Sequence, residues 1–155
     1  MLFRSGNTNI TFDSPKTVYW NFTGTGVQKW SSTSWATSSG GTPGVNNFPL
    51  AQDTAVFDNA GTAGTVEIDA GFSVGTVNMS SRTSTMDITC NPGNLYVFGD
   101  FIVGSGVSLS PNGTYPDRGV YMQGRSSTTL TTAEKTFQFP VYLDSYSGTV
   151  TLQGN

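Results

Sequence analysis

Apolar and polar residues alternate in short runs along most of the chain beyond residue 54. Alternation with a period of two places successive side chains on opposite faces of a β-strand, so each run predicts one half-buried strand. We expect a first firm strand at residues 55–57 and further strands that start near residues 66, 77, 86, 95, 107, 120, 128, 139 and 150. Glycine, asparagine, proline or serine separates most runs, which predicts a turn every 8 to 13 residues.

Helical signals are almost absent from the sequence. The two longest stretches without glycine or proline, residues 76–91 and 125–139, place no apolar residues at helical spacing. Residues 132–135, with the sequence TAEK, could form one helical turn, but their position between two strand patterns favours a simple turn. The pattern therefore predicts an all-β protein.

Two all-β architectures fit this strand spacing. An antiparallel β-sandwich or jelly roll has turn signals about every 8–12 residues, whereas a β-solenoid stacks the inward side chains of short strands from coil to coil. Two-residue hairpins of a sandwich favour Asn-Gly or Asp-Gly, and the chain has one such pair, Asn112 with Gly113. Because the strands are short and mostly separated by single glycines, we predict a short β-solenoid, with the antiparallel sandwich or jelly roll as the alternative.

The segment WSSTSWATSSGGTPGVNNFPLAQDTAVFD, residues 30–58, places bulky aromatic side chains beside a loop-like sequence. The first coil of a solenoid exposes apolar side chains and unpaired backbone groups unless something covers it. We therefore expect residues 1–58 to form an aromatic N-terminal cap with a long loop, and residues 59–155 to form solenoid repeats of the same single domain. Alternatively, the aromatic residues contact a partner, an attachment site or a glycan. The candidate contact residues are Trp20, Trp30, Trp35, Tyr19 and Phe48.

Serine and threonine, 41 of 155 residues, outnumber the charged residues, which make up 11% of the chain. The 10 phenylalanines, 6 tyrosines and 3 tryptophans supply a core, so the composition is that of a folded β-protein. The net charge is −3 and the 7 basic residues are scattered, so we expect no nucleic-acid partner. No apolar run approaches the roughly 18 residues that span a bilayer, so we expect no membrane partner.

The chain contains no histidine, which excludes the catalytic pairs and metal sites that depend on imidazole. Asp53 and Asp58 flank a predicted strand, and Glu67 and Asp69 are spaced as glycoside hydrolysis allows. The latter pair alternates with apolar residues, however, which predicts a position on the solvent face. Cys90 precedes an Asn-Pro-Gly turn signal and is expected to fill the core. We therefore predict no catalytic residue, no metal ligand and no cofactor.

The segments YWNFTGTG, GTVEIDAG, GDFIVGSGVSLS and SGTVTLQGN, together with residues 30–58, carry a family resemblance. They resemble the Gly/Ser/Thr-rich β-solenoid segments of bacteriophage virion proteins and of large bacterial surface proteins. The resemblance covers about residues 18–155. The chain departs from it where Asn21 and Phe22 separate Tyr-Trp from the glycine-rich turn. Because most members are long, the brevity of this chain suggests a small self-contained virion component or a fragment, and not a fibre.

The resemblance implies a non-enzymatic bacteriophage structural protein, which we expect to be a capsid decoration (cement) protein on the virion surface. Its expected partners are copies of itself, in a trimer, and the major capsid protein or other virion proteins. The alternative is a receptor- or glycan-binding module of a phage tail fibre or tailspike, or of a bacterial adhesin at the cell surface or secreted. Its ligand would be a host-surface glycan. A polysaccharide hydrolase or lyase is the third and weakest hypothesis.

Overall fold

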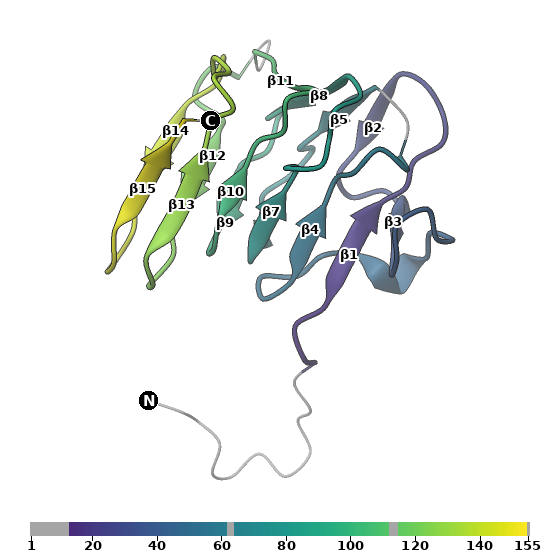
Figure 1. Ribbon diagram of the computed structural model, residues 1–155, viewed down its shortest axis with the longest axis horizontal. Coiled ribbons are helices and arrows are strands. Elements are labelled where there is room, and N and C mark those ends of the chain that lie inside the picture. The colour runs from purple at the N-terminus through teal and green to yellow at the C-terminus, as the bar shows by residue number, and fades with distance from the viewer. Residues whose placement is uncertain (1–12, 62–63, 112–114, 155) are drawn as a thin grey trace, which may run out of the picture.

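The computed structural model describes residues 13–61, 64–111 and 115–154. These residues form an all-β solenoid of about 4 turns, in which the chain passes repeatedly through three sheets, A, B and C (Figure 1). Every strand pairing between coils is parallel and in register, and the antiparallel pair of β1 with β3 is the exception within the described residues. The predicted solenoid is thereby confirmed over the antiparallel alternative.

Sheet A has seven strands in the order β15 (Val150–Gln153), β13 (Thr128–Thr131), β10 (Phe101–Ile102), β7 (Thr76–Asn78), β4 (Thr54–Val56), β1 (Thr17–Trp20) and β3 (Trp35–Ala36). Sheet B has four strands in the order β11 (Val107–Leu109), β8 (Met86–Thr89), β5 (Thr65–Glu67) and β2 (Val27–Lys29). Sheet C has four strands in the order β14 (Val141–Leu143), β12 (Val120–Met122), β9 (Leu95–Val97) and β6 (Phe72–Val74). One short 3-10 helix, η1 (Val45–Asn47), lies between β3 and β4.

The period-two pattern determines which side chains enter the core. In sheet A, Ala55, Val77, Phe101 and Leu130 are register partners on successive strands, and all four are buried. In sheet B, Val66 and its partner Ile88 are buried in the same way. Because register is repeated from coil to coil, each apolar side chain packs on the equivalent one of its neighbour, which gives the solenoid a continuous core.

Close approach of the coils explains two of the glycines between strands. A Cβ atom at Gly104 would lie 2.0 Å from the carbonyl oxygen of Met79, and one at Gly93 would lie 1.9 Å from that of Ala70. Both distances are far below van der Waals contact with backbone atoms of the preceding coil. The glycines that mark turns in the sequence therefore also allow the coils to stack.

The predicted strands beyond residue 60 start within two residues of observed ones. Residues 132–135 form a turn, as expected, with the Lys135 N–H donating to the carbonyl of Thr132 at 2.9 Å. The expectation that residues 55–57 form the first strand was wrong, because β1, β2 and β3 precede β4. The strand β6 was also missed, and β14 begins directly after Pro140, whose ring interrupts the alternation from residue 137 onward. The Asn112–Gly113 turn signal lies outside the described residues.

Residues 30–53 form the N-terminal cap. After β2 the chain does not continue into sheet C but turns back, adds β3 to the edge of β1 in antiparallel pairing and passes through η1 before β4 (Figure 1). The strands β1 and β2 lie within the expected cap segment 1–58, yet they pair with β4 and β5 and so form the first coil. The cap is therefore a loop insertion after the first two strands of the solenoid.

Candidate functional site

Three tryptophans that the sequence suggested as contact residues lie in one aromatic cluster, in which Trp30 and Trp35 of the cap pack with Trp20 of β1. Trp30 and Trp35 are completely buried and Trp20 is 1% exposed. Trp35 is central: its ring centroid lies 4.9 Å from that of Trp30, 5.2 Å from that of Trp20 and 5.4 Å from that of Phe57. These edge-to-face contacts are the arrangement that aromatic quadrupoles favour. The indole N–H of Trp35 also donates to the carbonyl of Trp30 at 3.0 Å.

The other two candidate contact residues are half-buried. Tyr19 lies on the outer face of β1, and Phe48 packs on Phe72 with a centroid distance of 5.4 Å. Tyr19 and Phe48 are thus partly accessible to a partner or glycan, whereas the three indole rings are covered by protein. The tryptophans therefore act in the described structure as core of the cap.

Asp53 fastens the end of the cap. Its side chain is 1% exposed, and Oδ1 accepts the backbone N–H of Lys16 at 3.0 Å while Oδ2 accepts that of Leu50 at 2.8 Å. The ammonium of Lys16 lies 3.6 Å from Oδ2. A buried carboxylate with two backbone donors and a cation close by is satisfied by the cap itself, so Asp53 holds a loop in place.

The remaining candidate carboxylates also have local partners. Glu67 and Asp69 are half-buried and flank the buried Ile68, which confirms that they lie on the outer face of sheet B. Asp69 accepts hydrogen bonds from the backbone and hydroxyl of Ser31 at 3.1 and 2.7 Å, and Glu67 accepts one from the Asn91 amide at 3.3 Å. These contacts fix neighbouring coils to each other.

Arg82 forms a clamp between backbone carbonyls, a role that the sequence did not predict. Its side chain is completely buried and donates to four backbone carbonyls, those of Ser84, Asp58, Gly61 and Thr85, at 2.9, 2.5, 2.6 and 3.3 Å. Burial lowers the pKa of the guanidinium, and the charge of Asp58 opposes that shift. No signal in the sequence SSRTST marks this role, because the four acceptors are carbonyls of turns that only the fold brings together.

Cys90 is completely buried at the end of β8, as expected. Burial raises the pKa of its thiol to about 12, so the reactive thiolate is scarce at neutral pH. Within the described ranges no three histidine, cysteine, aspartate or glutamate residues come together as a metal site would require. The described part of the chain also has no helix with the length and apolarity to cross a membrane.

The open end is the C-terminal face of the described solenoid, where β15 and β14 are the edge strands of sheets A and C among the described residues. Leu143 and Leu152 are 53% and 64% exposed there. Together with the residues beneath them they line an apolar hollow of about 330 Å³. The lining consists of Leu130, Thr132, Phe137, Phe139, Val141, Leu143 and Leu152. Apolar positions that are buried in the inner coils are therefore exposed at this end. The edge strands of sheets A and C at this end are β15 and β14 (Figure 1).

A column of tyrosines runs along the outer face of sheet C toward the open end. Tyr96, Tyr121 and Tyr142 are register partners on β9, β12 and β14. The centroids of Tyr121 and Tyr142 lie 4.2 Å apart with an interplanar angle of 17°, and those of Tyr96 and Tyr121 lie 5.2 Å apart. The stacked rings of Tyr121 and Tyr142 cover one face of each other, so these two faces are closed to a ligand.

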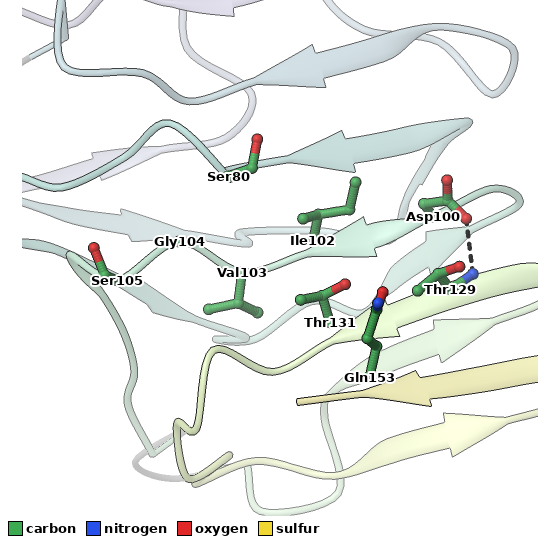
Figure 2. Close-up of a pocket in the computed structure, with 9 residues that line it drawn as sticks. All are labelled: Ser80, Asp100, Ile102, Val103, Gly104, Ser105, Thr129, Thr131 and Gln153. Atoms are coloured by element: carbon green, nitrogen blue, oxygen red, sulfur yellow. Dashed lines mark hydrogen bonds between the residues drawn. The ribbon is translucent and has the colours of Figure 1, made fainter. Parts of the chain in front are cut away.

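The groove is a polar hollow of about 430 Å³ on the outer face of sheet A. Figure 2 shows its lining, which comprises Ser80, Asp100, Ile102, Val103, Gly104, Ser105, Thr129, Thr131 and Gln153. Ile102, Thr131 and Gln153 are register partners on β10, β13 and β15. Asp100 Oδ1 accepts the backbone N–H of Thr129 at 2.7 Å (Figure 2). No sequence motif marks this site, since Asp100 lies 20 or more residues from Ser80, Thr129, Thr131 and Gln153.

Comparison of the chain with protein-family models, with curated proteins and with solved structures gave no significant match. Its function is therefore inferred from the geometry of the molecule.

Proposed function

We propose that the chain is a non-enzymatic structural protein of a bacteriophage particle, which decorates the capsid surface and attaches through its open end. The observation that carries this proposal is the difference between the two ends of the solenoid. The cap buries the aromatic core at one end, whereas Leu143 and Leu152 leave the core columns exposed at the other. Contiguous apolar surface of this kind is typical of protein contact sites.

The open end favours a partner that supplies both apolar side chains and backbone hydrogen bonds. The edge strands β14 and β15 pair with β12 and β13 on one side only, so their other side can accept an added strand. A second copy cannot continue the parallel repeat of sheet A head to tail, because β3 already occupies the free edge of β1. We therefore assign the open end to another virion protein, the major capsid protein in the first instance.

A trimer is compatible with this arrangement. Three solenoids related by a threefold axis parallel to their own axes present three open ends in the same direction, toward one common surface. Each cap then points outward, where its polar residues face water. The serine- and threonine-rich outer faces, which carry few charges, can hydrogen-bond between subunits.

The surroundings of the candidate catalytic residues support a non-enzymatic role. The sequence lacks histidine, and the carboxylates Asp53, Glu67 and Asp69 are occupied by structural hydrogen bonds. Cys90 is buried as a thiol. These residues hold coils and loops together and leave the outer faces rigid, which is what a decoration protein requires.

The proposed attachment is tested with capsids of the phage whose genome encodes this chain. The capsids are assembled without the chain. We expect the purified chain to form trimers in sedimentation-equilibrium experiments and to co-sediment with these capsids. The double variant Leu143→Asp, Leu152→Asp should bind at least about tenfold more weakly, because it places charges in the apolar contact.

Val45→Asp is the matched control, since Val45 is 73% exposed on the cap, at the opposite end. It should bind capsids like the unmodified chain. A monomeric chain that does not bind capsids would overturn the proposal, and so would equal loss of binding in both variants.

A further inference from the structure

The groove lies on the outer face of sheet A and shares Gln153 of β15 with the open end, and its lining has a definite chemical character. It combines the hydroxyls of Ser80, Ser105, Thr129 and Thr131 with the carboxamide of Gln153 and the carboxylate of Asp100. Hydroxyls and carboxamides both donate and accept hydrogen bonds, whereas a carboxylate only accepts. The site therefore suits a ligand that carries many groups able to donate and accept at once.

The charge of the groove excludes other ligand classes. Among the described residues no lysine or arginine lines it, and Asp100 gives it a negative charge, so phosphate, sulfate and acidic sugars are repelled. A calcium ion takes six to eight oxygen ligands, usually with several carboxylates, and this groove offers one. A neutral polyhydroxylated ligand remains.

The shape of the groove favours a short chain of such units. Ile102, Thr131 and Gln153 form one column across three neighbouring strands, so the column extends about 10 Å at the usual spacing of 4.8 Å between strands. The volume of about 430 Å³ is within the range of small-ligand sites. The half-buried side chain of Ile102 provides an apolar surface for the C–H face of a sugar ring (Figure 2).

Asp100 is already oriented for this task. Its Oδ1 accepts the N–H of Thr129 at 2.7 Å, and its own backbone N–H donates to the Thr76 hydroxyl at 3.3 Å. These bonds tie the residue to β7 and β13 on either side of β10. The second carboxylate oxygen, Oδ2, can then accept a ligand hydroxyl without a large loss of side-chain entropy.

We propose that the groove binds a neutral oligosaccharide, with Asp100, Thr129 and Gln153 as its polar contacts. Because none of the described residues that line the groove is aromatic, we expect the affinity to be in the millimolar range. The inference does not depend on attachment through the open end: a chain that decorates capsids but binds no saccharide would refute this inference alone.

The test is an NMR titration of the ¹⁵N-labelled chain with three neutral trisaccharides, maltotriose, cellotriose and triacetylchitotriose, and with trigalacturonic acid as an acidic comparison. We expect at least one neutral trisaccharide to shift the amide signals of Ser105, Thr129 and Gln153 while those of the cap stay in place. The acidic trisaccharide should shift them less. Absence of shifts for all three neutral sugars at tens of millimolar, or shifts elsewhere on the molecule, would overturn the proposal.

Two variants test the assigned contacts. Asp100→Asn retains an acceptor for the Thr129 N–H but loses the negative charge, and we expect about tenfold weaker binding. Thr129→Val removes a hydroxyl with little change in shape and should also weaken binding. The control is Asp87→Asn, a half-buried aspartate on the outer face of sheet B that accepts the Ser110 hydroxyl at 2.5 Å. If Asp100→Asn and Asp87→Asn bind equally well, the groove is not the site.

Discussion

At its N-terminal end the solenoid buries Trp20, Trp30 and Trp35 beneath residues 30–53, whereas at its C-terminal end Leu143 and Leu152 are 53% and 64% exposed. Coils along the whole solenoid are built from short strands that pair in parallel with their neighbours and in register. What differs is an insertion. The chain leaves the repeat after β2, adds β3 to sheet A in antiparallel pairing and resumes the parallel repeat at β4.

The difference between the two ends shows that one loop is enough to cover the aromatic core at one end of a solenoid. The coil itself always presents apolar side chains and unpaired backbone groups along its axis. A loop with large aromatic side chains can cover them at one end and leave the other end available for a partner. The attachment hypothesis and the stability of the fold therefore depend on different parts of the chain, which mutations can separate.

The largest effect is expected from Trp30→Ala in the cap. Trp30 is completely buried and packs against Trp35 and Phe57. Its loss leaves a large cavity and should lower the free energy of unfolding by about 3–5 kcal/mol, measured by urea denaturation. Val45→Ala on the exposed surface of the cap should change it by less than about 0.5 kcal/mol. Similar small effects for both variants would show that the cap does not stabilise the solenoid.

Arg82→Met is expected to have the next largest effect. It removes four hydrogen bonds to loop carbonyls in the half of the molecule next to the cap, and one of these carbonyls belongs to Gly61, which packs directly against Trp20. We expect a loss of about 3 kcal/mol in the free energy of unfolding, because the buried carbonyls are left without donors. Arg125→Met, at an exposed position, should be nearly neutral; an equal loss there would argue against the clamp.

The reactivity of the Cys90 thiol tests whether the core around it excludes solvent. Burial raises the pKa of its thiol from an ordinary value near 9 to about 12. Since the folded state binds this proton more tightly, the stabilising contribution is complete below pH 9 and is lost as the pH rises toward about 12. Unfolding experiments between these limits should show falling stability, and iodoacetamide should label the native thiol slowly at pH 8. Rapid labelling of the folded chain would contradict a sealed core.

Hydrogen exchange compares the two ends directly. The strand β4 is enclosed between β1 and β7, whereas β15 pairs with β13 alone. We expect the amides of β14 and β15 to be protected at least about tenfold less than those of β4, because the end strands can open without disrupting the core. Capsid binding should remove this difference if the open end is the attachment surface. Equal protection of both ends in the free chain would contradict the comparison.

The sequence predicted those features that depend on residue order alone. Alternation such as Val66 with Ile68 identified the strands and their inward faces, and the aromatic segment at residues 30–58 indicated the cap. The strand β6, Phe72–Val74, was missed because three residues with a glycine on each side give a single alternation.

The groove and the clamp could not be predicted in this way. Asp100, Thr129 and Gln153 come from three coils, and they share a surface only because each coil has a fixed register on the next. The number of residues between register partners also varies, from 22 between Ala55 and Val77 to 29 between Phe101 and Leu130, so no fixed repeat length indicates which residues meet. Arg82 likewise binds carbonyl groups, which every residue possesses, so no particular side chain marks its partners.

The smallest predicted effect concerns the turn at residues 132–135, beside the open end. Ala133 and Glu134 have φ angles of 49° and 57°, in the left-handed region, while Gly26 and Gly40 occupy such positions near the cap. A non-glycine residue is strained there by about 1–2 kcal/mol, part of which is offset by the chain entropy that glycine loses. Glu134→Gly should therefore raise the free energy of unfolding by about 0.5–1 kcal/mol. Lys135→Gly, where φ is not positive, should lower it by a similar amount; a decrease in both variants would show that the turn at the open end is not strained.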